Sequence, residues 1–175
     1  VCVRYDPILL NSKYNVDYHV RAFNKLCTML KGYVSKMIVS FVDDYKNVRN
    51  NHLDYHEPSN EEYLKLKEEF EKNDIKIISC MENKYQIGDE KDCCVSIKYA
   101  FERTGKLFKE WKARYCRCVN MVDVGAYNSC LHGCKYCYAN FDSKQIVSNY
   151  KMHDVNSSLL IGQLNLDDQI KIRRK

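Results

Sequence analysis

Three cysteines near the C-terminal end of the sequence have a spacing that suits a metal cluster. Cys130, Cys134 and Cys137 form the pattern CxxxCxxC, with Gly133 inside it. Intervals of four and three residues let one loop wrap a cuboidal iron–sulfur cluster with three thiolates on three irons, and glycine tolerates the positive φ that such a turn needs. The fourth iron then stays open to a substrate or cofactor. The spacing therefore predicts a 4Fe–4S cluster that does chemistry.

Two further cysteines, Cys116 and Cys118, precede this loop by about a dozen residues. They can supply a fourth cluster ligand, a second metal site or a redox pair, and we expect a metal role. If either bound the fourth iron, the cluster would be an electron carrier or a structural unit. His132, inside the loop, is expected to form hydrogen bonds rather than to bind the metal.

The remaining five of the ten cysteines carry a weaker signal. Cys2, Cys27 and Cys80 stand singly in apolar stretches, and free cysteine is among the most often buried residue types, so we predict that they pack in the core. Adjacent thiols such as Cys93 and Cys94 point in different directions in regular structure, and we expect Cys94 to be buried rather than to bind metal.

The elements that must position these groups are clearest in the first 80 residues. Residues 1–7, 37–42 and 75–80 have the apolar character of strands. An apolar stripe at helical spacing runs from Val16 to Leu30, and a second helix is predicted to begin at Ser59, which forms a capping box with Glu62. Strands alternating with helices at this spacing predict parallel pairing through right-handed βαβ units.

Parallel pairing would gather polar residues at the C-terminal ends of the strands. Arg4 and Asp6 lie at the end of the first strand, Asp43 follows the second and Glu82 follows the third. In parallel α/β folds this edge is where ligands bind. We expect the four residues to outline a cleft that binds a cofactor, although any one of them could instead form an ion pair or tie down a loop.

The predicted fold class is α/β, with the parallel βα repeats of a partial TIM-like barrel. Residues 1–110 would form the partial barrel, and residues 111–175 an irregular cysteine-rich region with the C-terminal tail. Three strands cannot close a barrel. Since the sequence also starts without methionine, we expect the chain to be a C-terminal fragment that lacks the N-terminal portion of the barrel.

The composition excludes several classes of protein. With 175 residues, 45% hydrophobic content and a net charge of +5, the chain can bury a core and is not intrinsically disordered. Its apolar runs are far shorter than the roughly 20 residues that cross a bilayer. The first residues lack the basic-then-apolar layout of a signal peptide, so we expect a chain that is not exported, reduced thiols and a cytoplasmic protein.

The cysteine loop resembles the cluster loop of radical S-adenosylmethionine enzymes, including the aromatic Tyr136 before the last cysteine. That resemblance implies S-adenosylmethionine on the open iron, an electron donor, a radical abstraction of hydrogen and a small-molecule substrate. The whole chain resembles a bacterial and archaeal family of unknown function whose C-terminal cysteine cluster is similar to that loop. The matching segments are residues 4–10, 40–43 with Tyr45, Cys80 with Glu82, 116–118, 122–140, and 153–154 with 159–162.

Two other functions compete with this interpretation. Cys116, Cys118 and two of the later thiols could hold zinc in a tetrahedral site and stabilise a binding module, although structural zinc sites usually bring CxxC-like pairs. Lysine, arginine and the 14 tyrosines could bind single-stranded nucleic acid. The tyrosines are scattered along the chain, which argues against that role. We predict an iron–sulfur protein, with enzymatic activity left open.

Overall fold

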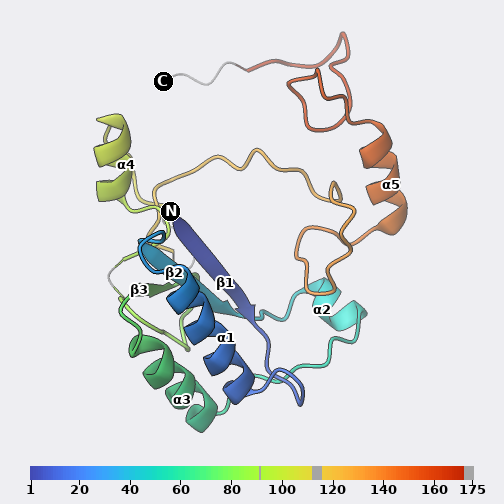
Figure 1. Ribbon diagram of the computed structural model, residues 1–175. Coiled ribbons are helices and arrows are strands. Elements are labelled where there is room, and N and C mark those ends of the chain that lie inside the picture. The colour runs from blue at the N-terminus through green and yellow to red at the C-terminus, as the bar shows by residue number, and fades with distance from the viewer. Residues whose placement is uncertain (91, 112–115, 172–175) are drawn as a thin grey trace. The chain divides into compact units, whose positions relative to one another are not determined.

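The computed structural model describes residues 1–90, 92–111 and 116–171 (Figure 1). The chain divides into two compact units, and Val1–Asp43 together with Asp54–Val122 forms unit 1. Asp44–Leu53 and the chain from Asp123 onward form unit 2. The chain up to Val122 packs with unit 1, beyond the domain boundary expected between residues 110 and 111. That boundary stays a prediction about domains that fold independently. No helix among the described residues has the length and apolar character needed to cross a membrane.

Unit 1 is built on a three-stranded parallel sheet in the order β1-β2-β3. The strands are β1 (Cys2–Ile8), β2 (Lys36–Phe41) and β3 (Lys76–Ser79). Tyr5 of β1 pairs with Val39 of β2, which in turn pairs with Ser79 of β3. All three strands match the predicted positions within a few residues and run parallel as predicted. The chain is therefore α/β, and its relation to a TIM-like barrel stays a prediction.

Two helices connect the strands, as the sequence pattern predicted. Helix α1 (Val16–Met29) begins where the Asn15 side chain accepts a hydrogen bond from the Tyr18 amide. Helix α3 (Asn60–Glu71) begins with the predicted capping box between Ser59 and Glu62. These side chains satisfy backbone amides that have no partner within the helix, which fixes where each helix starts.

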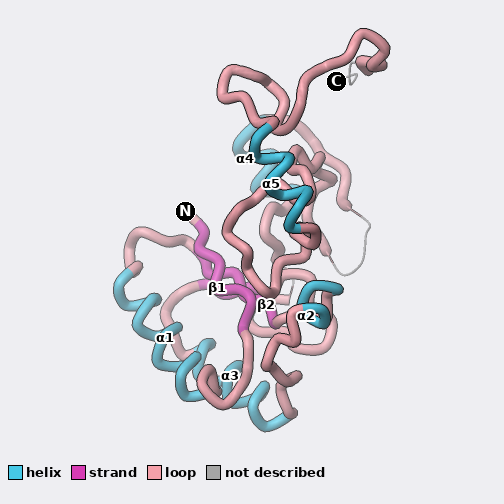
Figure 2. The backbone as a smooth tube through the Cα atoms, turned by 90° about the vertical axis from the view of Figure 1, so that its right-hand side faces the viewer, coloured by secondary structure: helices cyan, strands magenta, loops and turns pink. Residues whose placement is uncertain are grey.

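The main core lies between α1, α3 and one face of the sheet, and both views of the backbone place the two helices along that face (Figures 1 and 2). Phe23 of α1 stacks on Phe70 of α3 with ring centroids 3.9 Å apart, and both are fully buried. Met37 and Val39 of β2 point into the same core. Alternate residues of each strand therefore face the helices.

The opposite face of the sheet carries the other half of each strand and is also largely buried. Ile38 and Ile78 are 4% and 0% exposed. Beside them Lys36 extends its ammonium group to the carbonyl oxygen of Cys93 at 2.7 Å, which places the segment around Cys93 over this face. A parallel sheet is buried on both faces, and here a cysteine-bearing segment covers the face that α1 and α3 leave free.

The outer edge of β3 is occupied by the segment that follows it. The Asp89 amide donates to the carbonyl oxygen of Ile77 at 2.8 Å, and the Ile87 amide donates to the Ser79 hydroxyl at 2.8 Å. Gly88 has φ +80°, and a Cβ atom built on it would stand 2.1 Å from the same Ile77 oxygen. Only glycine can bring the backbone this close to the strand.

After this edge the chain forms α4 (Ile97–Thr104) and then doubles back on itself. Glu110 and Val119 form an antiparallel bridge. The Val119 amide also donates to the carbonyl oxygen of Val95 at 2.9 Å. These backbone bonds hold the segment that carries Cys116 and Cys118 against the segment that carries Cys93 and Cys94.

Unit 2 contains α2 (Lys46–Asn50), α5 (Ser143–Lys151) and the cysteine loop. The side chain of Asp142 caps α5 by accepting from the amides of Lys144 and Gln145. Outside these two helices the described part of unit 2 is irregular, as the sequence predicted for the cysteine-rich region. Side-chain hydrogen bonds rather than a sheet organise it.

Candidate functional site

The cysteine loop of unit 2 makes a turn at Gly133, which has φ +63° and open space where a Cβ atom would be. The Cys137 amide donates to the carbonyl oxygen of Cys134 at 3.1 Å and closes the turn. Cys130 and Cys134 are exposed and Cys137 is half-buried. The predicted role of glycine in the turn is confirmed.

Asparagine side chains hold the backbone of this loop. Three of them donate their amide hydrogens to loop carbonyl oxygens, and two of the three come from the region of α2. The pairs are Asn47 to Cys137 (2.7 Å), Asn51 to Lys135 (3.0 Å) and Asn140 to Cys130 (2.6 Å). Asn47 also donates to the carbonyl oxygen of Asn140. Since the carbonyls are engaged, the loop keeps its shape without a sheet or helix of its own.

Asn128 is the most buried member of this amide network, with 2% exposure and φ +55°. Its side-chain oxygen accepts from the amides of Phe141 (2.8 Å) and Asp142 (3.1 Å), and its side-chain nitrogen donates to Gln145 (2.9 Å). Its own carbonyl oxygen accepts from Asn149. Asn128 thereby ties the start of the cysteine loop to α5. Asparagine tolerates the left-handed conformation that this position requires.

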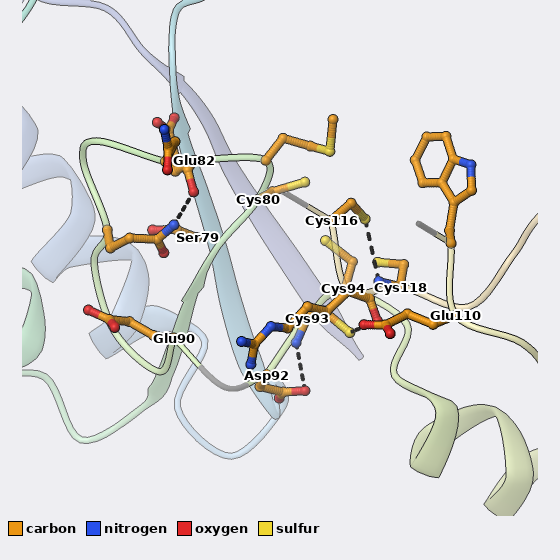
Figure 3. Close-up of a pocket in the computed structure, with 15 residues that line it drawn as sticks. Ser79, Cys80, Glu82, Glu90, Asp92, Cys93, Cys94, Glu110, Cys116 and Cys118 are labelled. Atoms are coloured by element: carbon orange, nitrogen blue, oxygen red, sulfur yellow. Dashed lines mark hydrogen bonds between the residues drawn. The ribbon is translucent and has the colours of Figure 1, made fainter. Parts of the chain in front are cut away.

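Five cysteines of unit 1 gather on the face of the sheet that α1 and α3 leave free (Figure 3). Cys80 follows β3, Cys93 and Cys94 cover the sheet, and Cys116 and Cys118 belong to the doubled-back segment. Side-chain hydrogen bonds join Cys80 to Cys94, Cys93 to Cys118 and Cys116 to Cys118. All ten cysteines of the chain are free thiols.

These thiols line a polar cavity of about 520 Å³. Four acidic groups complete much of its wall, namely Glu82, Glu90, Asp92 and Glu110 (Figure 3). Arg117 also lines it. Cys118 is 3% exposed and Cys93 is 7% exposed, while Cys80, Cys94 and Cys116 are partly exposed. The thiols face charged groups here and are not enclosed by an apolar core.

The electrostatic environment of Cys80 favours a thiolate. The Cys94 thiol donates to Cys80, and the Arg4 guanidinium lies beside them, so the pKa of Cys80 is lowered despite its burial. The same pairing, together with burial, raises the pKa of Cys94. Arg4 also donates from Nη1 to the Cys94 sulfur at 3.5 Å. One negative charge is therefore shared by the pair and stabilised by Arg4.

The four residues predicted to bind a cofactor divide into two pairs. Arg4 and Asp6 lie within β1 and form a two-pronged ion pair, with Nε and Nη2 at 2.9 and 2.6 Å from the same carboxylate oxygen. Glu82 accepts from the Phe41 amide at 2.6 Å. Burial raises the pKa of Glu82 to about 7, with further contributions from the negative charges of Asp43 and Cys80. Of the four, Glu82 lines the cavity. The alternative roles are also seen, since Arg4 and Asp6 form an ion pair and Glu82 holds the Phe41 amide.

Two of the three cysteines predicted to pack in the core do not lie there. Cys27 is buried against the main core, which confirms the prediction for that residue. Cys2 is exposed, because it stands at the start of β1 where the sheet meets solvent. Cys80 lines the polar cavity, because it follows β3 on the face away from α1 and α3.

The thiols of both cysteine groups are suitable ligands for a soft metal. The distances between them, however, are not those of thiols that bind a common metal ion. Among residues 1–90, 92–111 and 116–171, no three histidine, cysteine, aspartate or glutamate side chains stand at ligand spacing around one point. Three sulfur atoms nevertheless accept backbone amide hydrogens, as thiolate ligands do. The donors are Ala139 to Cys137 (3.4 Å), Cys118 to Cys116 (3.4 Å) and Val95 to Cys118 (3.5 Å).

The amide network and the gathering of cysteines in unit 1 are features that sequence reasoning missed. The asparagines follow no period, and nothing local marks them as partners of the loop. The sequence did contain a signal for the gathering, because Cys80 directly follows a strand end, where ligands bind in parallel sheets, and further cysteines follow it along the chain. Its position in an apolar stretch nevertheless favoured core packing.

Comparison with known proteins places the chain among proteins of unknown function. Residues 1–139 match the domain of unknown function DUF1848. No curated protein and no solved structure matches the chain.

Proposed function

The chain belongs to the DUF1848 family, and from that premise we propose that it is an iron–sulfur protein similar to radical S-adenosylmethionine enzymes. Cys130, Cys134 and Cys137 would hold a 4Fe–4S cluster by three irons. When bound, such a cluster supplies single electrons, and its open iron can coordinate S-adenosylmethionine. The observation that carries the proposal is the CxxxCxxC loop held in shape by asparagine side chains.

The residues around the loop support a preformed site. Gly133 gives the turn, and Asn47 and Asn140 hold the carbonyls of Cys137 and Cys130. Because the backbone is fixed, cluster binding would mainly require rotation of side chains, which lowers the entropic cost of assembly. The Ala139 amide already donates to the Cys137 sulfur and would stabilise its thiolate form.

The cavity of unit 1 is the place where we propose that a small-molecule partner binds. It is about 520 Å³ in volume, within the usual range for ligand pockets, and it is polar. Glu82 lines it, Asp43 lies close to Glu82, and the ion pair of Arg4 and Asp6 is linked to it through Cys94. We keep these four residues as the proposed cofactor-binding set and leave the substrate open.

The free state of the thiols supports a reducing compartment. Ten cysteines without a disulfide are typical of cytoplasmic proteins. We therefore propose a cytoplasmic protein whose cluster takes its electron from a separate donor.

Reconstitution with iron and sulfide under anaerobic conditions tests the proposal. The native chain and the variant C130A/C134A/C137A would be compared by iron and sulfide content and by electron paramagnetic resonance of the reduced samples, with and without S-adenosylmethionine. We expect a signal that changes on addition of S-adenosylmethionine in the native chain and is absent from the variant. C2S, which removes an exposed thiol outside both groups, serves as the control and should behave as the native chain.

Two results would contradict the proposal. One is stoichiometric zinc without iron in the native chain, which would favour the zinc-stabilised module. The other is an iron content and signal that the triple variant retains in full.

A further inference from the structure

The cysteines gathered in unit 1 form a group of their own that needs no residue of the loop in unit 2. We propose that Cys80, Cys94, Cys116 and Cys118 are the four ligands of a second metal site, a tetrathiolate site for a soft metal centre. This inference goes beyond the proposed function and stands whether or not the loop binds a cluster.

The first observation is the convergence of four thiols from three separate segments. Cys80 is hydrogen-bonded to Cys94, and Cys116 to Cys118. The two pairs are close enough to interact electrostatically, Cys80 with Cys116 and Cys94 with Cys118. All four thiols line one cavity, and together they supply the sulfur donors that zinc and iron–sulfur clusters take once their side chains rotate toward a common centre.

The second observation is that this is not ordinary packing of small apolar side chains. The thiols border a cavity whose wall includes Glu82, Asp92 and Arg117. Buried cysteine that serves only to fill a core is surrounded by apolar groups, as Cys27 is in the main core. A wall of thiols beside charged groups indicates a binding function.

The third observation is the set of hydrogen bonds to the sulfur atoms. The Cys118 amide donates to the Cys116 sulfur at 3.4 Å, and the Val95 amide donates to the Cys118 sulfur at 3.5 Å. Arg4 donates to the Cys94 sulfur at 3.5 Å. Such donors stabilise thiolates in metal sites and orient them. Three of the bonds are therefore in place before a metal binds.

The charge of the surroundings fits a site with a net negative charge. Four thiolates around a divalent metal leave about two negative charges, which need compensation when they are buried. Arg4 supplies one positive group directly, and Lys36 lies under the same segment, where its ammonium group contacts the Cys93 carbonyl. The S–H···S pairs carry protons that the metal displaces on binding, because cysteine binds metal as thiolate.

Cys93 has a different role and provides a matched control. Its thiol is 7% exposed and donates to the carbonyl oxygen of Arg117 at 3.2 Å. A thiol that donates to a carbonyl keeps its proton and does not act as a thiolate ligand in this position. Serine can replace this donor, so Cys93→Ser should preserve the site.

Cobalt binding tests the site without interference from the loop. The full chain carrying C130A/C134A/C137A would be reduced, freed of metal by a chelator and titrated with Co²⁺ under anaerobic conditions. We expect one Co²⁺ per chain, with thiolate-to-cobalt charge-transfer absorption of the strength that four sulfur ligands give. Adding Cys94→Ser or Cys118→Ser should weaken cobalt binding by more than the roughly 100-fold that loss of an outer-shell partner can cost. Adding Cys93→Ser should leave binding unchanged.

The outcomes separate this site from the loop and identify its metal. Cobalt binding that survives Cys94→Ser and Cys118→Ser overturns the proposal, as does the absence of charge-transfer absorption in a chain that circular dichroism shows to be folded. The proposal is also overturned if the protein purified from anaerobic cells contains a disulfide between Cys80 and Cys94 and no metal. Reconstitution of the same triple variant with iron and sulfide distinguishes the two supporting results, a cluster with about four irons or a single zinc ion. Failure of the S-adenosylmethionine response in the native chain, by contrast, concerns only the loop.

Discussion

Replacement of Asn128 tests whether side-chain amides hold the cysteine loop in place. Asn128→Gly keeps the left-handed conformation but removes the acceptor for the Phe141 and Asp142 amides. With about 1 kcal/mol for each hydrogen bond, and more where a buried amide is left unpaired, we expect a loss of about 2–4 kcal/mol in the free energy of unfolding. Asn128→Ala adds the left-handed backbone penalty of roughly 1–2 kcal/mol. Asn128→Asp keeps the acceptor and should cost only about 1 kcal/mol.

Hydrogen exchange of the Phe141 and Asp142 amides gives the most direct measurement, with urea unfolding as the second. Exchange should accelerate most in the alanine variant and least in the aspartate variant. Asn156→Ala changes an exposed asparagine of the same unit and should alter neither measurement by more than about 0.5 kcal/mol. The reasoning is wrong if the glycine and alanine variants exchange these amides as slowly as the native chain, or if alanine is tolerated better than glycine.

Three other predictions concern the core, the edge of the sheet and the loop. Burial lowers the pKa of His19, whose Nε2 donates to a backbone carbonyl and whose Nδ1 accepts from the Tyr5 hydroxyl at 2.8 Å. The neutral ring therefore stabilises the folded state in full above about pH 6.5, and this stabilisation is lost as the pH falls further. Urea unfolding from pH 7 to 5 should show this slope in the native chain, and a His19→Asn variant with the same slope would refute it. Gly88→Ala should lower the free energy of unfolding by more than about 3 kcal/mol, measured by thermal unfolding, because its Cβ atom would clash with the β3 carbonyl oxygen. Gly32→Ala has open space at a similar φ and should lower it by only about 1–2 kcal/mol. Equal losses for the two variants would contradict the steric argument. Asn47→Asp replaces two donated hydrogen bonds by charge repulsion and should reduce the iron retained by the loop several-fold with little change in unit 1, and unchanged retention would exclude a role for this amide.

The parallel α/β part of the chain could be predicted from the sequence because its signals are local. Apolar strand segments, the stripe on α1 and the capping box at Ser59 each lie within a few consecutive residues. The short helix α2 has only five residues and no apolar stripe, and it is held by contacts of Asn47 and Asn51 with distant chain. Local patterns carry no information about such contacts.

The candidate sites divide in the same way. The cysteine loop is visible in the sequence because its three thiols and Gly133 are neighbours in the chain. The group formed by Cys80, Cys94, Cys116 and Cys118 depends on backbone bonds such as that between Val119 and Val95, which join segments more than 20 residues apart. Residue type and spacing predicted a metal role for Cys116 and Cys118 but core packing for Cys80 and burial for Cys94, and the fold shows that all four line one cavity.

The segment beside β3 also limits how the sheet can be extended. Its backbone already satisfies the outward carbonyl oxygen of Ile77, and Gly88 lies close enough to that oxygen to leave no room for another chain there. A strand added to this sheet, whether from another protein or from an aggregate, would meet an occupied border at β3. The chain's own backbone therefore protects the β3 edge from further pairing, and it does so because residue 88 is glycine.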